Sequence, residues 1–307
     1  MEKIILFTSA VLSTMVFADD ISITQGRAIT DIDNLYACGN SYRKSGVGHV
    51  VDSMNNKWTV PAPVIFPQAR KAHDLYNKCS KTVPASIDQV DVSSVPIVEI
   101  DSDGEVITGY IFADNYFELY VNGVLVGVDP VPFTQFNSNI VRFRVKSPVT
   151  YAIRLVDWEE NLGLGSEDNR GNAFHAGDGG FVASFSDGTV TDSSWKAQTF
   201  YTAPIDSPSN IKTVGNVRDS SMVDIDKLSC GENCFAAHWP LSSDWFNESF
   251  DDSSWPSASE FTNDVIGVKN KPAYMNFSAL FIGKNAKFIW SSNVVLDNHV
   301  IIRKTTK

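Results

Sequence analysis

The segment from residue 157 to residue 180 holds the densest group of side chains that could bind a ligand. Its acidic start, Asp157-Trp158-Glu159-Glu160, is followed by glycines and by further carboxylates. Binding sites concentrate in loops that rigid strands hold in place. We therefore expect a ligand or cation site here, and a solvated loop without a ligand is the alternative. The expected ligand-binding residues are Glu160, Asp168 and Asp178, with Trp158 and Trp239 as aromatic rings on which a sugar could stack.

The residues expected to bind a metal ion overlap with these expected ligand-binding residues. Asp101 and Asp103 stand at alternate positions of a glycine turn, and the acidic segment adds Glu160, Asp168 and His175. Carboxylate oxygens suit calcium, and histidine nitrogens also suit copper or zinc. However, the histidines of the chain show no short metal spacing, and Asp and Gly occupy the same positions in an ordinary β-turn. Calcium is the candidate cofactor, with copper and zinc as alternatives.

Adjacent carboxylates also raise the question of catalysis. Glycoside hydrolases use two carboxyl groups that flank the scissile bond, and Glu159 and Glu160 would be the candidates. The chain has no Gly-x-Ser-x-Gly motif for a serine nucleophile. Because such chemistry also needs a deep cleft, we favour a non-catalytic protein and keep hydrolysis as the weaker alternative.

The N-terminus has the pattern of a secretory signal. Met1-Glu2-Lys3 precedes an apolar run that ends in Val16-Phe17-Ala18, a small-x-small cleavage site. We expect residues 1–18 to be removed and the protein to be secreted or held at the cell surface; a buried first helix is the alternative. No later run approaches the roughly 20 apolar residues of a membrane-spanning helix. With a net charge of −11, the chain repels phosphate backbones, so nucleic acid is not an expected partner.

Four cysteines are present, and an even number in an exported chain favours disulfides. We pair Cys38 with Cys79 and Cys230 with Cys234 by proximity along the chain, and two other pairings stay open. A four-thiolate zinc site is the alternative. It would need two close cysteine pairs, whereas only Cys230 and Cys234 are close.

These side chains must be positioned by strands, and the clearest strand signal is a hairpin. Phe117, Leu119 and Val121 alternate with polar residues, which predicts a half-buried strand. Asn122-Gly123 suits a tight hairpin turn, and the return strand begins directly after it. Further predicted strands cover residues 97–100, 105–112, 139–145, 150–158, 181–185, 279–282, 287–290 and 300–303. Many short strands between turns predict an all-β protein, a β-sandwich or jelly roll.

Residues 19–90 differ from the rest of the chain because they hold many turn formers and few alternating runs. One helix is expected over residues 68–78, where apolar residues fall on one face after Pro67. We therefore divide the mature chain into a small loop-rich, disulfide-tied lead-in over residues 19–90 and a β-sandwich over residues 91–307. The sandwich carries an insertion at about 204–240.

Four patterns, in order, resemble the galactose-binding-like jelly-roll domains attached to bacterial glycosidases such as rhamnosidases and β-galactosidases. They are Ala113–Gly123, Gly188–Lys196, Trp245–Pro256 and Phe288–Arg303. The resemblance covers residues 95–307 and implies a single jelly roll in which Trp195, Trp255 and Trp290 are core. Domains of this family usually bind sugars or support a catalytic domain, and no catalytic domain is recognised here.

The expected function is that of a secreted, non-catalytic binding module for carbohydrate, with a glycan or another cell-surface or matrix component as its partner. A secreted metal-binding protein, which would use calcium or a copper or zinc site built from histidines, is the alternative. A glycoside hydrolase is the second alternative.

Overall fold

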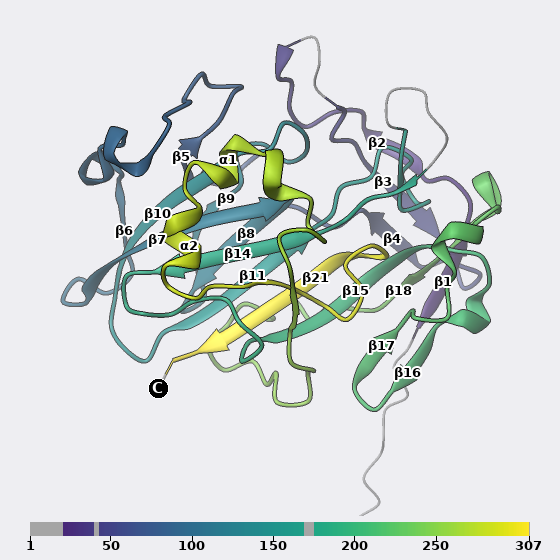
Figure 1. Ribbon diagram of the computed structural model, residues 1–307. Helices are drawn as coiled ribbons and strands as arrows, with labels where there is room; N and C mark the ends of the chain where they lie inside the picture. The colour runs from purple at the N-terminus through teal and green to yellow at the C-terminus, as the bar shows by residue number, and fades with distance from the viewer. Residues whose placement is uncertain (1–20, 40–42, 169–174, 307) are drawn as a thin grey trace, which may run out of the picture.

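The computed structural model describes residues 21–39, 43–168 and 175–306, so the predicted signal peptide at residues 1–18 lies outside it. Two seven-stranded sheets dominate the fold (Figure 1). In order across the first sheet, the strands are β1 (Ser22–Gln25), β18 (Phe235–His238), β15 (Lys196–Ile205), β21 (Asp297–Thr305), β11 (Thr150–Val156), β8 (Tyr116–Val121) and β9 (Val124–Val128).

The second sheet packs against the first. Its strands, in order, are β19 (Ser259–Phe261), β20 (Phe288–Trp290), β14 (Gly180–Phe185), β7 (Glu105–Asp114), β10 (Ser138–Val145) and β5 (His73–Tyr76), and β6 (Ile97–Glu99) also pairs with β10. Within the two sheets, β6 on β10 is a parallel pair, and the neighbours along both strand orders are antiparallel. The prediction of an all-β sandwich is confirmed.

Smaller elements complete the chain. A three-stranded sheet consists of β2 (Ile29–Ile32), β3 (Val47–Val51) and β4 (Lys57–Val60). Two hairpins are formed by β12 (Ser166–Glu167) with β13 (His175–Ala176) and by β16 (Lys212–Val214) with β17 (Val217–Asp219). The α-helices are α1 (Pro272–Met275) and α2 (Ser278–Ile282). The 3₁₀ turns are η2 (Ile87–Gln89), η3 (Val92–Ser94), η5 (Pro208–Asn210), η6 (Ile225–Lys227), η7 (Gly231–Asn233) and η8 (Val268–Asn270). No helix in the described part of the chain is long and apolar enough to cross a membrane.

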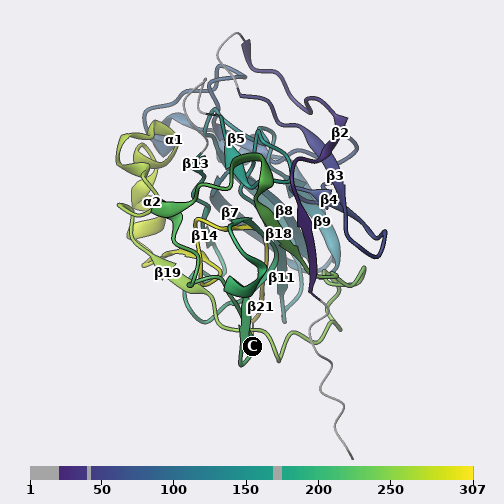
Figure 2. The same ribbon diagram turned by 90° about the vertical axis from the view of Figure 1, so that its right-hand side faces the viewer.

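The elements form layers, which Figure 2 shows edge-on: the two helices, the second sheet, the first sheet and the β2–β3–β4 sheet. The main core lies between the two large sheets and extends under the helices, where Tyr274 contacts Phe112 and Phe288. On the other side of the molecule, the stacked rings of Trp58, His238 and Tyr201 join β4 to the outer face of the first sheet. The first sheet is therefore covered on both faces, whereas the helices cover only part of the outer face of the second sheet, where alternate residues of β7 and β10 stay partly exposed.

This double coverage changes the environment of the central hairpin. β8 and β9 form it as predicted, and Asn122 and Gly123 have φ angles of 46° and 76°, as a tight turn requires. All six residues of β8 are buried, including Glu118. The prediction of a half-buried strand is wrong because a second layer of chain covers the outer face.

The predicted helix over residues 68–78 is also wrong. These residues form a turn, a short connection and strand β5, which pairs with β10. The backbone N–H of Ala72 donates to Val128 O of strand β9 (2.8 Å). Pairing with the edges of both sheets therefore overrides the local helical pattern. Residues 19–90 also contribute β1 to the edge of the first sheet.

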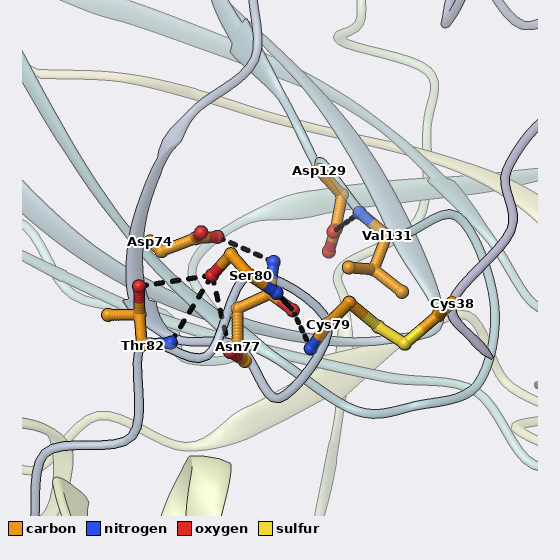
Figure 3. The surroundings of a disulfide bond; sticks show 8 residues. All are labelled: Cys38, Asp74, Asn77, Cys79, Ser80, Thr82, Asp129 and Val131. Carbon is orange, nitrogen blue, oxygen red and sulfur yellow. Dashed lines mark hydrogen bonds between the residues drawn. A yellow bond between two sulfur atoms is a disulfide. The ribbon is translucent and has the colours of Figure 1, made fainter.

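Both predicted disulfides are confirmed, Cys38–Cys79 and Cys230–Cys234. Figure 3 shows the first one beside the turn that follows β5. Asn77 shapes this turn, because its Oδ1 accepts a hydrogen bond from the Cys79 N–H (2.9 Å) and its Nδ2 donates to Asp74 (2.9 Å). The bridge thus ties the segment around Cys38 to the turn that follows β5 of the second sheet, not to the end of a helix.

Most of the other predicted strands are confirmed to within two residues, but residues 279–282 are not a strand. They lie in α2, whose backbone bonds are local: Gly283 N donates to Ala279 O (3.1 Å). The helix contacts β14 through Ser184, whose hydroxyl donates to Leu280 O (2.9 Å). The apolar run therefore covers the second sheet instead of joining it. Trp195, Trp255 and Trp290 are buried as predicted.

Candidate functional site

The acidic segment after β11 folds back on itself as the β12–β13 hairpin. Residues 169–174, which separate the two strands in the sequence, lie outside the described part of the chain. In the register of the hairpin, Glu167 lies opposite His175, with 3.7 Å between Oε2 and Nε2. The hairpin brings together two residue types that the sequence could only place in the same loop.

The predicted cation ligand Glu160 is paired with an arginine. Arg43 donates from Nη2 to Glu160 and from Nη1 to Glu167, both at 2.6 Å, and its guanidinium lies 4.9 Å from the ring centroid of Phe133. The Asp168 N–H also donates to Glu160 (2.7 Å). Because a cation from residues 19–90 bridges two carboxylates, this group fastens the hairpin to the N-terminal region.

The two tryptophans predicted as exposed platforms are buried, so that part of the prediction is wrong. Trp158 is 1% exposed and packs edge-on against Tyr116, and its indole N–H donates to Gly46 O (3.0 Å). Trp239 is 3% exposed and lies beneath the guanidinium of Arg218. In the described residues, the exposed large apolar side chains are all aliphatic. The two tryptophans therefore offer no exposed ring on which a sugar could stack.

Behind the hairpin lies a buried carboxyl group, Asp157. It is 3% exposed, and its Oδ1 has no hydrogen-bond partner among the described residues. Gly177 covers it closely, because a Cβ at that position would lie 2.8 Å from Asp157 Oδ2. Burial raises the pKa of Asp157, and the negative charges of Asp114 and Glu167 raise it further. Asp157 is therefore held toward its neutral form.

Asp178 follows the hairpin, at the start of β14. Burial, and then the negative charge of Glu167, raise the pKa of Asp178 to about 6. Glu160, Asp168 and Asp178, the three predicted ligand-binding carboxylates, all lie in or next to this hairpin segment. Their partners differ, however: Glu160 faces Arg43, whereas Lys271 and His175 are the cations that lower the pKa of Asp178.

Next to the hairpin is a pocket of about 460 Å³. One wall comes from the hairpin and the other from residues 225–234, inside the predicted insertion and next to the Cys230–Cys234 bridge. It is lined by Ser166, His175, Ala176, Pro204, Ile225, Asp226, Leu228, Ser229, Gly231 and Cys234. The lining combines aliphatic surface with hydroxyl, imidazole and carboxylate groups.

The turn at Asp101 and Asp103 is a different arrangement. Asp101 Oδ2 accepts a hydrogen bond from the Lys146 N–H (2.9 Å), and Asp103 pairs with Lys146 Nζ at 2.6 Å. The two carboxylates therefore fasten the turn to the end of β10. In the described residues, no group of three or more His, Cys, Asp and Glu side chains is placed to hold a metal ion.

The residues expected from the sequence to bind the ligand, Trp158, Glu160, Asp168, Asp178 and Trp239, do not line this pocket, and His175, an expected metal ligand, does. His175 was a candidate, but Ser166, Asp226 and Ser229 were not, and neither was Arg43 as the partner of the acidic loop. No local motif marks these residues. Their roles arise only when residues far apart in the chain meet.

A scan against protein-family models, a search of curated proteins and a search of solved structures each returned no match. The resemblance to galactose-binding-like domains therefore stays an interpretation of the sequence.

Proposed function

We propose that this protein is a secreted, non-catalytic module that binds a neutral glycan in the pocket beside the β12–β13 hairpin. One observation carries the proposal: an aliphatic wall and a hydrogen-bonding rim meet in a pocket of about 460 Å³. Ligand pockets typically have a few hundred Å³ of space and combine apolar surface with a few polar groups that fix orientation. A pyranose ring matches both kinds of surface, because it carries apolar C–H groups as well as hydroxyls.

The individual side chains support this assignment. Ile225, Leu228 and Pro204 supply aliphatic surface for the C–H face of a sugar. Asp226 accepts hydrogen bonds from hydroxyls, and His175 and the serine hydroxyls of the lining can donate or accept. Because the chain has a net charge of −11, a neutral glycan fits better than a polyanionic one.

Binding is favoured over hydrolysis by the number of carboxylates. Acid–base cleavage of a glycosidic bond uses two carboxyl groups on either side of the bond. Among the residues that line the pocket, Asp226 is the one acidic side chain. Glu159, considered above for hydrolysis, is 1% exposed and accepts a hydrogen bond from the Tyr201 hydroxyl (2.9 Å). Both disulfides support an oxidising, extracellular compartment.

Affinity electrophoresis and a glycan array, with the secreted protein, test the proposal. We expect retention by at least one neutral glycan, and a loss of about tenfold or more in affinity for Asp226→Ala and for His175→Ala, since each removes a hydrogen-bonding group. Asp224→Ala is the matched control, because Asp224 lies in the same segment, pairs with Lys227 and does not line the pocket. No retention of the parent protein, or an equal loss in the control, would contradict the proposal.

Calcium stays a prediction, and the same assay examines it. Each measurement is repeated in EDTA and in calcium. If calcium is part of the site, retention and thermal stability both fall in EDTA. If neither changes, the glycan site works without the cation.

A further inference from the structure

A second cavity lies at the outer edge of β10, where the two large sheets meet. Two separate strands cover this edge. β5 runs antiparallel to β10, with its first residue, His73, opposite Ile140, whereas β6 runs parallel to β10, with its first residue, Ile97, opposite Arg142. Between these two registers lies Val141. The edge therefore has a break between one covering strand and the next.

The segment that precedes β5 closes this edge against the first sheet. Val128 of β9 donates its N–H to Arg70 O (2.9 Å) and accepts the Ala72 N–H (2.8 Å). One short stretch of chain thus joins β9, the last strand of the first sheet, to β10 in the second. The break in the β10 edge lies next to this seam.

A cavity of about 390 Å³ opens at the seam, and its lining is of two kinds. The apolar residues are Ala72, Val95, Pro96, Val98, Val126, Ile140 and Val141. The others are Arg70, Lys71, His73 and Arg142, so none of the lining residues is acidic. In a chain with 36 Asp and Glu against 25 Lys and Arg, this is a local reversal of charge.

Neutral groups hold two of these cations in place. Arg142, a lining residue, donates from Nη1 to the carbonyl oxygens of Ser93 (3.0 Å) and Val95 (3.2 Å), which fixes the orientation of its guanidinium. Its buried Nε has no hydrogen-bond partner among the described residues. Lys71 donates to carbonyl oxygens, including that of Ala69 (3.1 Å), and lies 3.9 Å from the ring centroid of Phe66. Carbonyls and a ring orient these charges without neutralising them.

We propose that the seam cavity binds a small aliphatic carboxylate, with its hydrocarbon chain between the sheets and its carboxylate at the basic rim. Apolar walls favour burial of methylene groups, and guanidinium groups recognise carboxylates with paired hydrogen bonds. At about 30 Å³ for a water-sized group, 390 Å³ has room for roughly a dozen non-hydrogen atoms. The cavity shares no lining residue with the proposed glycan pocket, so the two proposals are independent.

Isothermal titration with octanoate tests the proposal, and comparison ligands separate the two parts of the site. Octanol keeps the chain without the charge, acetate keeps the charge without the chain, and octylammonium reverses the charge. We expect octanoate to bind at least tenfold more tightly than octanol and at least 100-fold more tightly than acetate, and octylammonium not to bind. Vesicles that contain an anionic lipid should not compete with octanoate.

Protein variants and hydrogen exchange locate the site. Arg70→Gln changes an exposed side chain at the rim and should weaken octanoate binding about tenfold. Arg144→Gln is the matched control, because Arg144 lies on β10 two residues after Arg142, pairs with Glu99 and does not line the cavity. Octanoate should also slow amide exchange in residues 70–73 and 139–142 of the parent protein. Equal affinity for octanol and octanoate, equal effects of the two variants, competition by vesicles, or protection elsewhere would each overturn the proposal.

Discussion

The ion pair between Glu118 and Arg154 tests how the N-terminal region is fastened to the first sheet. The two residues lie opposite each other on β8 and β11, with 2.8 Å between Oε2 and Nη1, and their side chains are 0% and 7% exposed. Arg154 also donates to Pro63 O (2.6 Å), and Glu118 Oε1 accepts the Ile65 N–H (2.7 Å). One buried charge pair therefore links β8 to β11 and also fastens the segment around Pro63 and Ile65 to the outer face of the sheet.

Glu118→Gln should be strongly destabilising because it leaves the charge of Arg154 buried without a counter-charge. Breaking a buried pair in this way costs about 3–5 kcal/mol of the free energy of unfolding. An unfolding entropy of about 2.1 cal/mol/K per residue gives about 0.6 kcal/mol/K for 307 residues. The melting temperature should therefore fall by about 5–8 °C.

Glu99→Gln is the matched control. Glu99 pairs with Arg144 at 2.9 Å, but the side chains are 56% and 30% exposed, so the loss should be under about 1 kcal/mol. Calorimetry and urea unfolding, without reductant so that the disulfides persist, give both values. Replacing both buried partners, as Glu118→Leu with Arg154→Met, should recover most of the loss. If Glu118→Gln costs no more than Glu99→Gln, the pair is not the buried anchor that its geometry indicates.

Two further predictions concern Glu159 and the disulfides. Burial raises the pKa of Glu159 to about 7. Between about pH 4.5 and 7 the folded protein therefore keeps a proton that the unfolded chain releases. The free energy of unfolding falls as the pH rises through this range. Urea unfolding at several pH values should show a decline of about 3 kcal/mol from this group, absent in Glu159→Gln. Replacing Cys38 and Cys79 by serine should cost about 4 kcal/mol, against about 2 kcal/mol for Cys230 and Cys234, because the first bridge closes a longer loop; equal losses would contradict this.

The sequence predicted strands well where alternation was strict and a turn residue fixed the end. Residues 139–145 and the Asn122-Gly123 hairpin are examples. It failed where two local patterns competed. Residues 68–78 have helical spacing but pair with β9 and β10, and the apolar run at 279–282 forms α2 on top of a sheet. In both cases the partner lies far away in the chain, and no local window contains it.

The candidate site could be located only in part for the same reason. The glycines and carboxylates of the acidic loop pointed to the segment that forms the β12–β13 hairpin, which supplies part of the pocket lining. However, Trp158 beside a loop gave no sign that Gly46 and Tyr116 would enclose it. The pairing of Arg43 with Glu160 joins residues 117 positions apart, so its geometry depends on the completed fold.

The layered construction also explains where cavities form in this protein. Helices cover part of the outer face of one sheet, and segments of residues 21–90 and 204–255 cover the other, so much of the flat strand surface is not available to ligands. Space is left where one covering segment ends and another begins. The pocket at His175 lies between the hairpin and residues 225–234, and the seam cavity lies between β5 and β6. At such junctions apolar walls and polar groups meet, which is the combination that small ligands require.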